Sequence, residues 1–289
     1  MNYRFSGHDT FHCKQQWLLK GFNFILENEI SGFSNITKSI TYLGVGKNMV
    51  SSVKYWLEAF GITNENNLTE FSNLIFSSED GLDRYLENEG TLWLLQYKLC
   101  QKKYASIYHL LFTEYFDDKV NYEFSEEKII KFILNKLENN GVKSISESTL
   151  SNDFKVLIRT YISSSKEIKN IEEEFNAPLL ELNLIERIEN HKYILNKINR
   201  TIPLEILGYC ILDMTKEHNN TSLKLEEIKR TIGNYFCITN ECLQDLLSQL
   251  NEVSEVFVYT DHAGIATLDI KQNTDELRNE LLINYYHAN

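Results

Sequence analysis

The chain has 289 residues, enough for about two or three compact units, and its 43% hydrophobic and 12% aromatic content suits ordinary globular packing. Twelve glycines and two prolines are few for a β-sandwich, which needs many turns. A net charge of −12 is not typical of a protein that binds nucleic acid. The five cysteines lack metal-binding spacing and no run approaches the roughly 20 apolar residues of a membrane span, so we expect a cytoplasmic protein with reduced thiols and no membrane contact.

The first 60 residues differ in charge from the rest of the chain. They contain six Lys and Arg against four Asp and Glu, although the whole chain is strongly acidic. Exposed charges act over only roughly 10 Å at ordinary salt, so a local basic face is compatible with an acidic total.

A cluster of reactive side chains precedes the first expected helix: His8, Asp9, Thr10, His12 and Cys13. A nucleophile, a base and an acid all occur there, so His8, Asp9 and His12 are candidate catalytic residues. The cluster lacks the second ligand pair of a zinc site. We favour the alternative in which Asp9 or Thr10 caps the helix and His8 bonds to the backbone.

Residues 1–78 are expected to form a winged helix-turn-helix domain. Apolar residues recur at helical spacing in three segments, with a glycine-containing turn before the third: 11–26, 36–42 and 47–60. Ile62 and residues 68–76 could supply the wing. A plain three-helix bundle with a solvated polar face remains the alternative.

The outer arc of the third helix carries the candidate DNA-contacting residues. These are short or cationic groups suited to phosphates and base edges: Lys47, Asn48, Ser51, Ser52 and Lys54. The stretch also contains Gly46-Lys47, but a phosphate-binding loop would need glycine where Thr41 stands and Ser or Thr in place of Asn48. We therefore interpret the stretch as a helix that reads DNA.

Residues 79–170 are expected to form a helical middle domain. A buried helix is predicted from Thr91 to Phe112, preceded by acidic residues that include Asp80 and Asp83. Carboxylates of this kind can bind Mg²⁺ or Mn²⁺ in a nuclease, but more often they favour a helix N-terminus. We favour the helix-capping interpretation.

A second helix-turn-helix-like unit is expected within this middle domain. Residues 125–139 and 146–161 are amphipathic, and the second helix presents Ser151, Lys155 and Arg159 outward as candidate DNA contacts. Residues 143–170 contain five basic and three acidic residues. Two ordinary packing helices explain the pattern nearly as well.

Residues 171–289 are expected to form a C-terminal winged-helix-like domain, with a boundary near residues 165–180. Three helical patterns precede an expected β-hairpin, and a last helix follows it: 203–217, 223–232, 240–254 and then 275–285. The helix at 240–254 is acidic on its outer side, so we interpret this domain as a packing or dimerisation module.

Four ordered blocks resemble a bacterial family of unknown function. In one-letter code they are FSGHDTFHCKQQWLLKG, LGVGKNMVSSVKYWLEAFG, DGLDRYLENEGTLWLLQYKL and STLSNDFKVLIRTY. The family is similar to the SspB component of DNA phosphorothioation systems. The resemblance implies a place in anti-phage defence loci, a sulfur-transfer partner like phosphoadenylylsulfate reductase, and a possible DNA nickase activity. Gln96 stands where the family leads us to expect histidine.

The resulting expectation is a protein that binds double-stranded DNA within a phosphorothioate modification system. If it nicks DNA, the resemblance implies Mg²⁺ or Mn²⁺ as the cofactor. Two alternatives remain: a non-catalytic DNA-binding adaptor or transcriptional regulator, and a scaffold whose winged helices bind other proteins.

Overall fold

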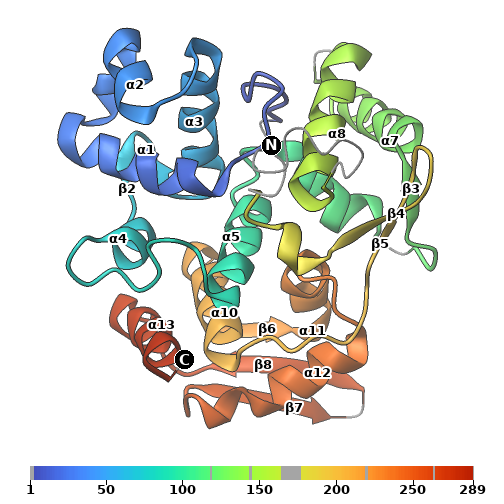
Figure 1. Ribbon diagram of the computed structural model, residues 1–289. Helices are drawn as coiled ribbons and strands as arrows, with labels where there is room; N and C mark the ends of the chain where they lie inside the picture. Colours follow the sequence, from blue (N-terminus) through green and yellow to red (C-terminus); the bar gives the residue numbers. More distant parts are fainter. Residues whose placement is uncertain are drawn as a thin grey trace. The chain divides into compact units, whose positions relative to one another are not determined.

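The computed structural model describes residues 3–117, 119–142, 145–163, 177–218, 221–262 and 264–288. The chain forms two compact units, residues 1–196 (unit 1) and 197–289 (unit 2). Helices predominate, and the described strands form small antiparallel sheets (Figure 1). The expected mostly helical class is confirmed. The division into domains at residues 1–78, 79–170 and 171–289 stays a prediction, since its second boundary falls largely outside the described residues.

Unit 1 begins with three helices that pack against one another: α1 (Gln15–Asn28), α2 (Ile36–Leu43) and α3 (Lys47–Ala59). The side chain of Asn35 caps α2, and Gly44 ends it in the left-handed region with φ of 67°. Gly21 lets α1 approach α3, because a Cβ there would lie 2.6 Å from a methyl of Leu57. The three helices expected in this region are present.

The segment after α3 differs from the expected wing. A short hairpin comes first, made of β1 (Thr63–Asn64) and β2 (Asn67–Leu68), and helix α4 (Glu70–Phe76) follows it. Residues 68–76 are therefore mainly helical. The physical reason is that Thr69 caps α4 by accepting from the Ser72 amide, while Phe71, Ile75 and Phe76 become buried at helical spacing.

The buried helix expected from Thr91 to Phe112 is divided in the structure. Helix α5 (Glu89–Gln101) ends before a turn, and the chain continues through α6 (Ser106–His109) and the π-helical turn η2 (Leu110–Tyr115). Lys103 has φ of 58°, which a helix does not allow. The hydroxyl of Ser106 donates to the carbonyl of Lys103 and holds this turn.

The second half of unit 1 combines two helices with a three-stranded sheet. Its elements are β3 (Glu123–Ser125), α7 (Glu126–Asn139), α8 (Glu147–Tyr161), β4 (Ile185–Glu189) and β5 (Lys192–Leu195). The strand order is β3-β5-β4 and both pairings are antiparallel. The helices agree with the sequence prediction, whereas the sheet was not expected.

Unit 2 repeats this order of elements. It consists of α10 (Leu204–His218), β6 (Ser222–Lys224), α11 (Leu225–Ile228) with the π-helical turn η5 (Lys229–Gly233), α12 (Asn240–Gln249), β7 (Phe257–His262), β8 (Ile265–Ile270) and α13 (Asp275–Ala288). Its strand order is β6-β8-β7, so the last strand again lies between the other two. Helix α12 therefore occupies the topological place that α8 has in unit 1.

Candidate nucleic-acid interface

Helix α3 presents the polar face that its sequence predicts. Lys47, Asn48, Ser51 and Lys54 are exposed. The opposite arc is packed into the unit, with Val53 1% and Trp56 0% exposed. Because its apolar face is packed, the helix can present two cations and two short hydrogen-bonding side chains to a ligand.

Ser52 is the exception among the predicted contacts on α3. Its side chain is fully buried, and its hydroxyl donates to the carbonyl oxygen of His8 at 2.5 Å. The neighbouring Tyr55 is likewise buried, at 2% exposed. The reason is that the N-terminal segment covers this edge of α3, so Ser52 holds that segment and is unavailable to DNA.

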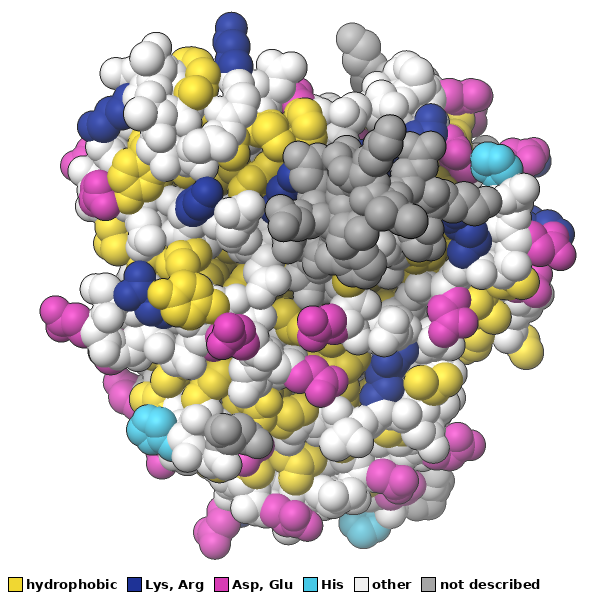
Figure 2. All heavy atoms as spheres, in the orientation of Figure 1, with side chains coloured by type: hydrophobic (Ala, Val, Ile, Leu, Met, Phe, Trp, Pro, Cys, Tyr) yellow, Lys and Arg dark blue, Asp and Glu magenta, His cyan; other side chains and the backbone are white. Residues whose placement is uncertain are grey.

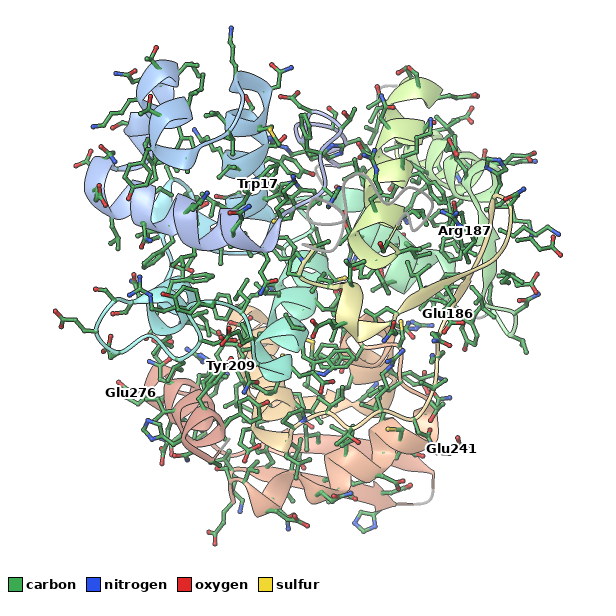
Figure 3. All side chains as sticks on the ribbon, in the orientation of Figure 1. Trp17, Glu186, Arg187, Tyr209, Glu241 and Glu276 are labelled. Atoms are coloured by element: carbon green, nitrogen blue, oxygen red, sulfur yellow. The ribbon has the colours of Figure 1, made fainter. Side chains whose placement is uncertain are left out.

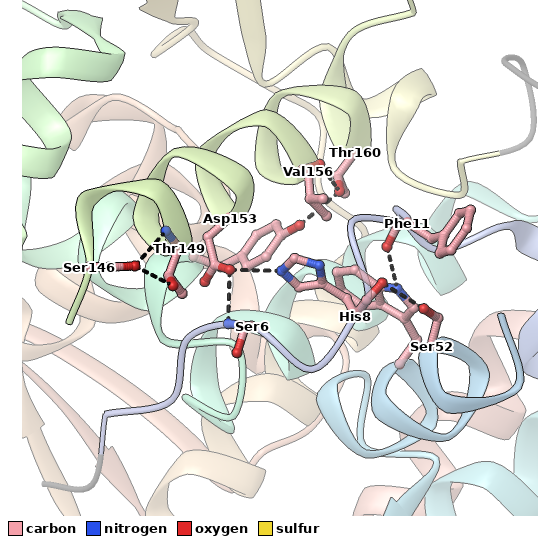
Figure 4. A network of polar contacts seen from close by, with 11 residues as sticks. Ser6, His8, Phe11, Ser52, Ser146, Thr149, Asp153, Val156 and Thr160 are labelled. Carbon is pink, nitrogen blue, oxygen red and sulfur yellow. Dashed lines mark hydrogen bonds and ion pairs between the residues drawn. The ribbon is translucent and has the colours of Figure 1, made fainter. Parts of the chain in front are cut away.

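The N-terminal segment is fixed between α3 and α8 by a buried polar network (Figure 4). His8 Nε2 lies 2.9 Å from Asp153 Oδ1, which also accepts from the amide of Ser6 at 2.8 Å. Both side chains of this pair are buried, with His8 3% and Asp153 2% exposed. The His8 ring stacks on Trp56, whose indole N–H donates to the carbonyl of Phe11. Residues 6–11 are thus tied to both helices.

The side chains of the reactive cluster predicted around His8 differ in burial, and His8 itself stabilises the fold. His8 bonds to the carboxylate of Asp153 rather than to the backbone, Asp9 is exposed and His12 is half-buried. Helix α1 begins after Lys14 without a side-chain cap, so Asp9 and Thr10 do not cap it as expected. Burial raises the pKa of the Cys13 thiol well above its usual value, which keeps this side chain protonated.

Sequence reasoning missed Asp153, although the chain carries a signal for it. This carboxylate lies on the inner arc of α8, between the buried side chains of Leu150, Phe154 and Leu157. A charged residue on an apolar helix face indicates a buried partner, because an unpaired charge there would lower the free energy of unfolding by about 3–5 kcal/mol.

Helix α8 contributes a second exposed pair of cations, Lys155 and Arg159. The guanidinium of Arg159 donates through Nε to the carbonyl of Lys155, one turn back along the same helix. Ser151 is half-buried and its hydroxyl donates to Glu126 on α7 at 2.5 Å. Lys155 and Arg159 are therefore open to a ligand, whereas Ser151 already has a partner within the unit.

The carboxylates proposed as metal ligands do not come together. Asp80 is exposed, and Asp83 accepts from the amides of Glu87 and Asn88 and from the Thr91 hydroxyl. Asp83 thereby fixes the start of α5, in agreement with the capping interpretation. Within the described ranges there is no group of three or more His, Cys, Asp or Glu arranged to hold a metal ion. These residues do not fit a resident Mg²⁺ or Mn²⁺.

Gln96 occupies a core position. Its side chain is fully buried on α5, and its amide oxygen accepts from the Tyr161 hydroxyl at 2.6 Å. The amide group also lies 3.5 Å from the sulfur of Cys100. The substitution relative to the histidine expected from the family therefore concerns a buried hydrogen bond between α5 and α8.

The surface charge is not concentrated in one large basic patch on the face shown in Figure 2, where acidic side chains are widespread and cations are scattered. The exposed face of α12 in unit 2 is acidic, whereas that of α8 carries cations. Glu241, labelled in Figure 3, and Asp245 are exposed on α12. Exposed cations are found locally, as on α3 and α8.

None of the helices in the described part of the chain is long and apolar enough to cross a membrane.

Two exposed polar helix faces, on α3 and α8, are joined through the buried network of His8 and Asp153. This arrangement defines a candidate interface for an anionic ligand.

The chain belongs to the family described as protein of unknown function (DUF4007), whose model matches residues 5–286. The resemblance seen in the four sequence blocks is therefore confirmed. A comparison with curated proteins gives no match.

Solved structures of SspB share this fold. One is the SspB crystal structure, with a TM-score of 0.84 and 22% identity, covering 99% of this chain and 88% of that one. Another is magnesium ion-bound SspB, with a TM-score of 0.83, 21% identity and the same coverage. Agreement at this identity establishes that the backbone architecture is shared.

Proposed function

We propose that this protein is the DNA-binding component of a bacterial DNA phosphorothioate modification system. The observation that carries the proposal is the exposed face of α3, where Lys47 and Lys54 flank Asn48 and Ser51 on a helix whose opposite side is buried. Cations supply the phosphate contacts that dominate affinity, and short polar side chains can reach base edges.

The arrangement around α3 supports a helix-turn-helix interpretation. Helix α2 and α3 are joined by the short turn at residues 44–46, and the β1–β2 hairpin follows α3. In this interpretation α3 enters the major groove while neighbouring groups contact the backbone. Lys155 and Arg159 on α8 add phosphate contacts.

The shared order of elements in residues 123–195 and in unit 2 supports a winged-helix interpretation of both, with α8 and α12 as the equivalent third helices. Their outer faces differ in charge. The acidic face of α12, with Glu241 and Asp245, disfavours phosphate and suits a protein partner or a second copy of the chain. Unit 2 is therefore proposed as the part that holds a partner.

The assignment to phosphorothioation rests on the family resemblance and on the fold shared with SspB. Replacing a phosphate oxygen with sulfur requires access to the DNA strand, so a DNA-binding protein is a sensible companion of a sulfur-transfer enzyme. We place the protein with such an enzyme in the bacterial cytoplasm.

The test measures binding of a fluorescent DNA duplex by anisotropy at several salt concentrations. The double variant Lys47→Glu/Lys54→Glu should weaken binding and flatten the slope of log affinity against log salt by about 0.9 for each phosphate that is no longer neutralised. Lys271→Glu, at an exposed position in unit 2, provides a control with the same type of charge change. Equal binding by both variants would show that α3 is not the DNA-reading helix.

The neighbours Ser51 and Ser52 provide a second comparison. Ser51→Ala should lower affinity with little effect on stability, because Ser51 is exposed. Ser52→Ala should lower stability by about 1 kcal/mol, because the His8 carbonyl loses a buried donor, and should leave contacts to DNA in place. A stronger effect on affinity from Ser52→Ala would contradict the proposed orientation of α3.

A metal-dependent nickase is the second candidate, favoured by the magnesium ion in one solved SspB structure. The described carboxylates offer no matching ligand group, so no catalytic step is assigned to them. Incubation of supercoiled plasmid with Mg²⁺ or Mn²⁺ tests this candidate directly. Nicking that survives Asp80→Ala/Asp83→Ala and His8→Ala/Asp9→Ala/His12→Ala would remove all the residues singled out for it.

A further inference from the structure

Arg4 is held in a defined position on the surface of unit 1. Its guanidinium carbon lies 4.0 Å from the centre of the Tyr104 ring and 5.3 Å from that of Tyr55. Arg4 itself is exposed, whereas Tyr55 is 2% exposed. A cation stacked on aromatic faces is attracted to them electrostatically and keeps its N–H donors directed outward.

The backbone at Arg4 is anchored as firmly as the side chain. Its amide donates to the Ser106 hydroxyl at 2.8 Å, and its carbonyl accepts from the Ser106 amide at 3.1 Å. This reciprocal pair ties the N-terminal segment to the start of α6. The position of Arg4 is therefore set by contacts from a distant part of the sequence.

Gly7 makes room for this arrangement. Its φ is 101°, a conformation that favours glycine, and an added Cβ would lie 2.8 Å from the Tyr55 ring and 3.3 Å from the Arg4 guanidinium. The segment passes so close to the stacked pair that only a residue without a side chain fits there.

The charge of Arg4 is not neutralised within the described residues, since none of their carboxylates forms an ion pair with it. The nearby Glu58 accepts from the Thr63 hydroxyl at 2.7 Å and lies 3.8 Å from the Lys102 ammonium. Arg4 thus combines a fixed orientation with a positive charge that no carboxylate of the described residues pairs, which suits an external anion.

We propose that Arg4 binds a backbone phosphate of DNA and is oriented for this by Tyr104 and Tyr55. The inference rests on the proposed DNA-binding function and adds a contact from the N-terminal segment to those on α3. Guanidinium groups form paired hydrogen bonds with phosphate oxygens, and stacking reduces the side-chain freedom lost on binding.

The experiment compares variants of the full chain in the duplex-binding assay. Arg4→Ala should lower affinity about tenfold and reduce the salt slope by about 0.9, since one phosphate is left without its cation. Arg4→Lys should retain the slope with lower affinity, because a lysine keeps the charge but not the paired geometry. Arg4→Gln serves as a variant that preserves side-chain length if Arg4→Ala does not fold.

Tyr104 provides the matched test of orientation. Tyr104→Phe keeps the aromatic face and should bind like the unmodified protein, whereas Tyr104→Leu should weaken binding about threefold without changing the salt slope. Equal affinity of Tyr104→Phe and Tyr104→Leu would refute the orienting role of this ring.

The outcomes separate this inference from the function on which it rests. If Lys54→Ala lowers affinity and salt slope while Arg4→Ala and Arg4→Gln change neither, Arg4 does not touch a phosphate and the α3 interface stands. If the unmodified protein shows no salt-dependent duplex binding, both the proposed function and the role of Arg4 are wrong.

Discussion

Replacement of Asp153 by alanine tests the buried network that joins α3 to α8. Asp153 Oδ1 accepts from His8 Nε2 at 2.9 Å and from the Ser6 amide at 2.8 Å. A carboxylate oxygen accepts hydrogen bonds, so this pair requires the His8 tautomer with its proton on Nε2. The variant leaves both donors without their acceptor while the His8 ring remains buried.

The expected cost follows from the burial of the two donors. A buried donor left without a partner costs about 1–3 kcal/mol. Ser6 is exposed, so its amide can turn to water, whereas His8 is 3% exposed and cannot. We therefore expect Asp153→Ala to lower the free energy of unfolding of unit 1 by about 1–3 kcal/mol, the cost of the single donor on His8. Asp153→Asn keeps one acceptor oxygen and should cost about 1 kcal/mol.

Tryptophan fluorescence during urea unfolding measures this effect in the correct unit. The three tryptophans, Trp17, Trp56 and Trp93, all lie in unit 1 and are at most 2% exposed. Trp56 stacks directly on the His8 ring, so its emission also reports the network itself. A loss below about 0.5 kcal/mol for Asp153→Ala would refute the argument that this pair fixes the N-terminal segment.

Three further predictions concern other parts of the fold. Burial, and then Lys103, lowers the pKa of His109 to about 4 from 6.5. Its contribution to stability is therefore present above about pH 6.5 and is lost as pH falls toward 4, by up to about 3 kcal/mol, and His109→Gln should flatten this part of the unfolding profile. Gly21→Ala should cost about 1–2 kcal/mol in urea unfolding, because its Cβ would press on the buried Leu57. Arg278→Ala should lower the melting temperature of unit 2 by circular dichroism, with a loss of about 2 kcal/mol, because this buried side chain bonds to Asn273 and Asp275.

Helical periodicity was the most informative part of the sequence. It gave α3 within one residue of its end and placed Val53 and Trp56 inward with Lys47 and Lys54 outward. Periodicity succeeds here because the residues that define a helix face are close together in the chain. It could not place Ser52, because the segment that buries this side chain lies 44 residues earlier.

The sheet β3-β5-β4 was missed for a related reason. Its strands have three to five residues each, and Ser125 pairs with Lys192 far along the chain. Strands this short show too little alternation of apolar and polar residues to be recognised in the sequence. Their pairing depends on the packing of the helices between them. The capping role of Asp83 was accessible, because its partners follow within eight residues.

The link between His8 and Asp153 also has a consequence for biosynthesis. The two residues are 145 positions apart, so the N-terminal segment leaves the ribosome about 7 to 30 s before its partner has been made. During that interval the N-terminal segment, which bonds to Ser52 and Trp56, lacks its buried acceptor on α8. The contact that fixes the N-terminal segment between α3 and α8 can therefore close only after α8 has emerged.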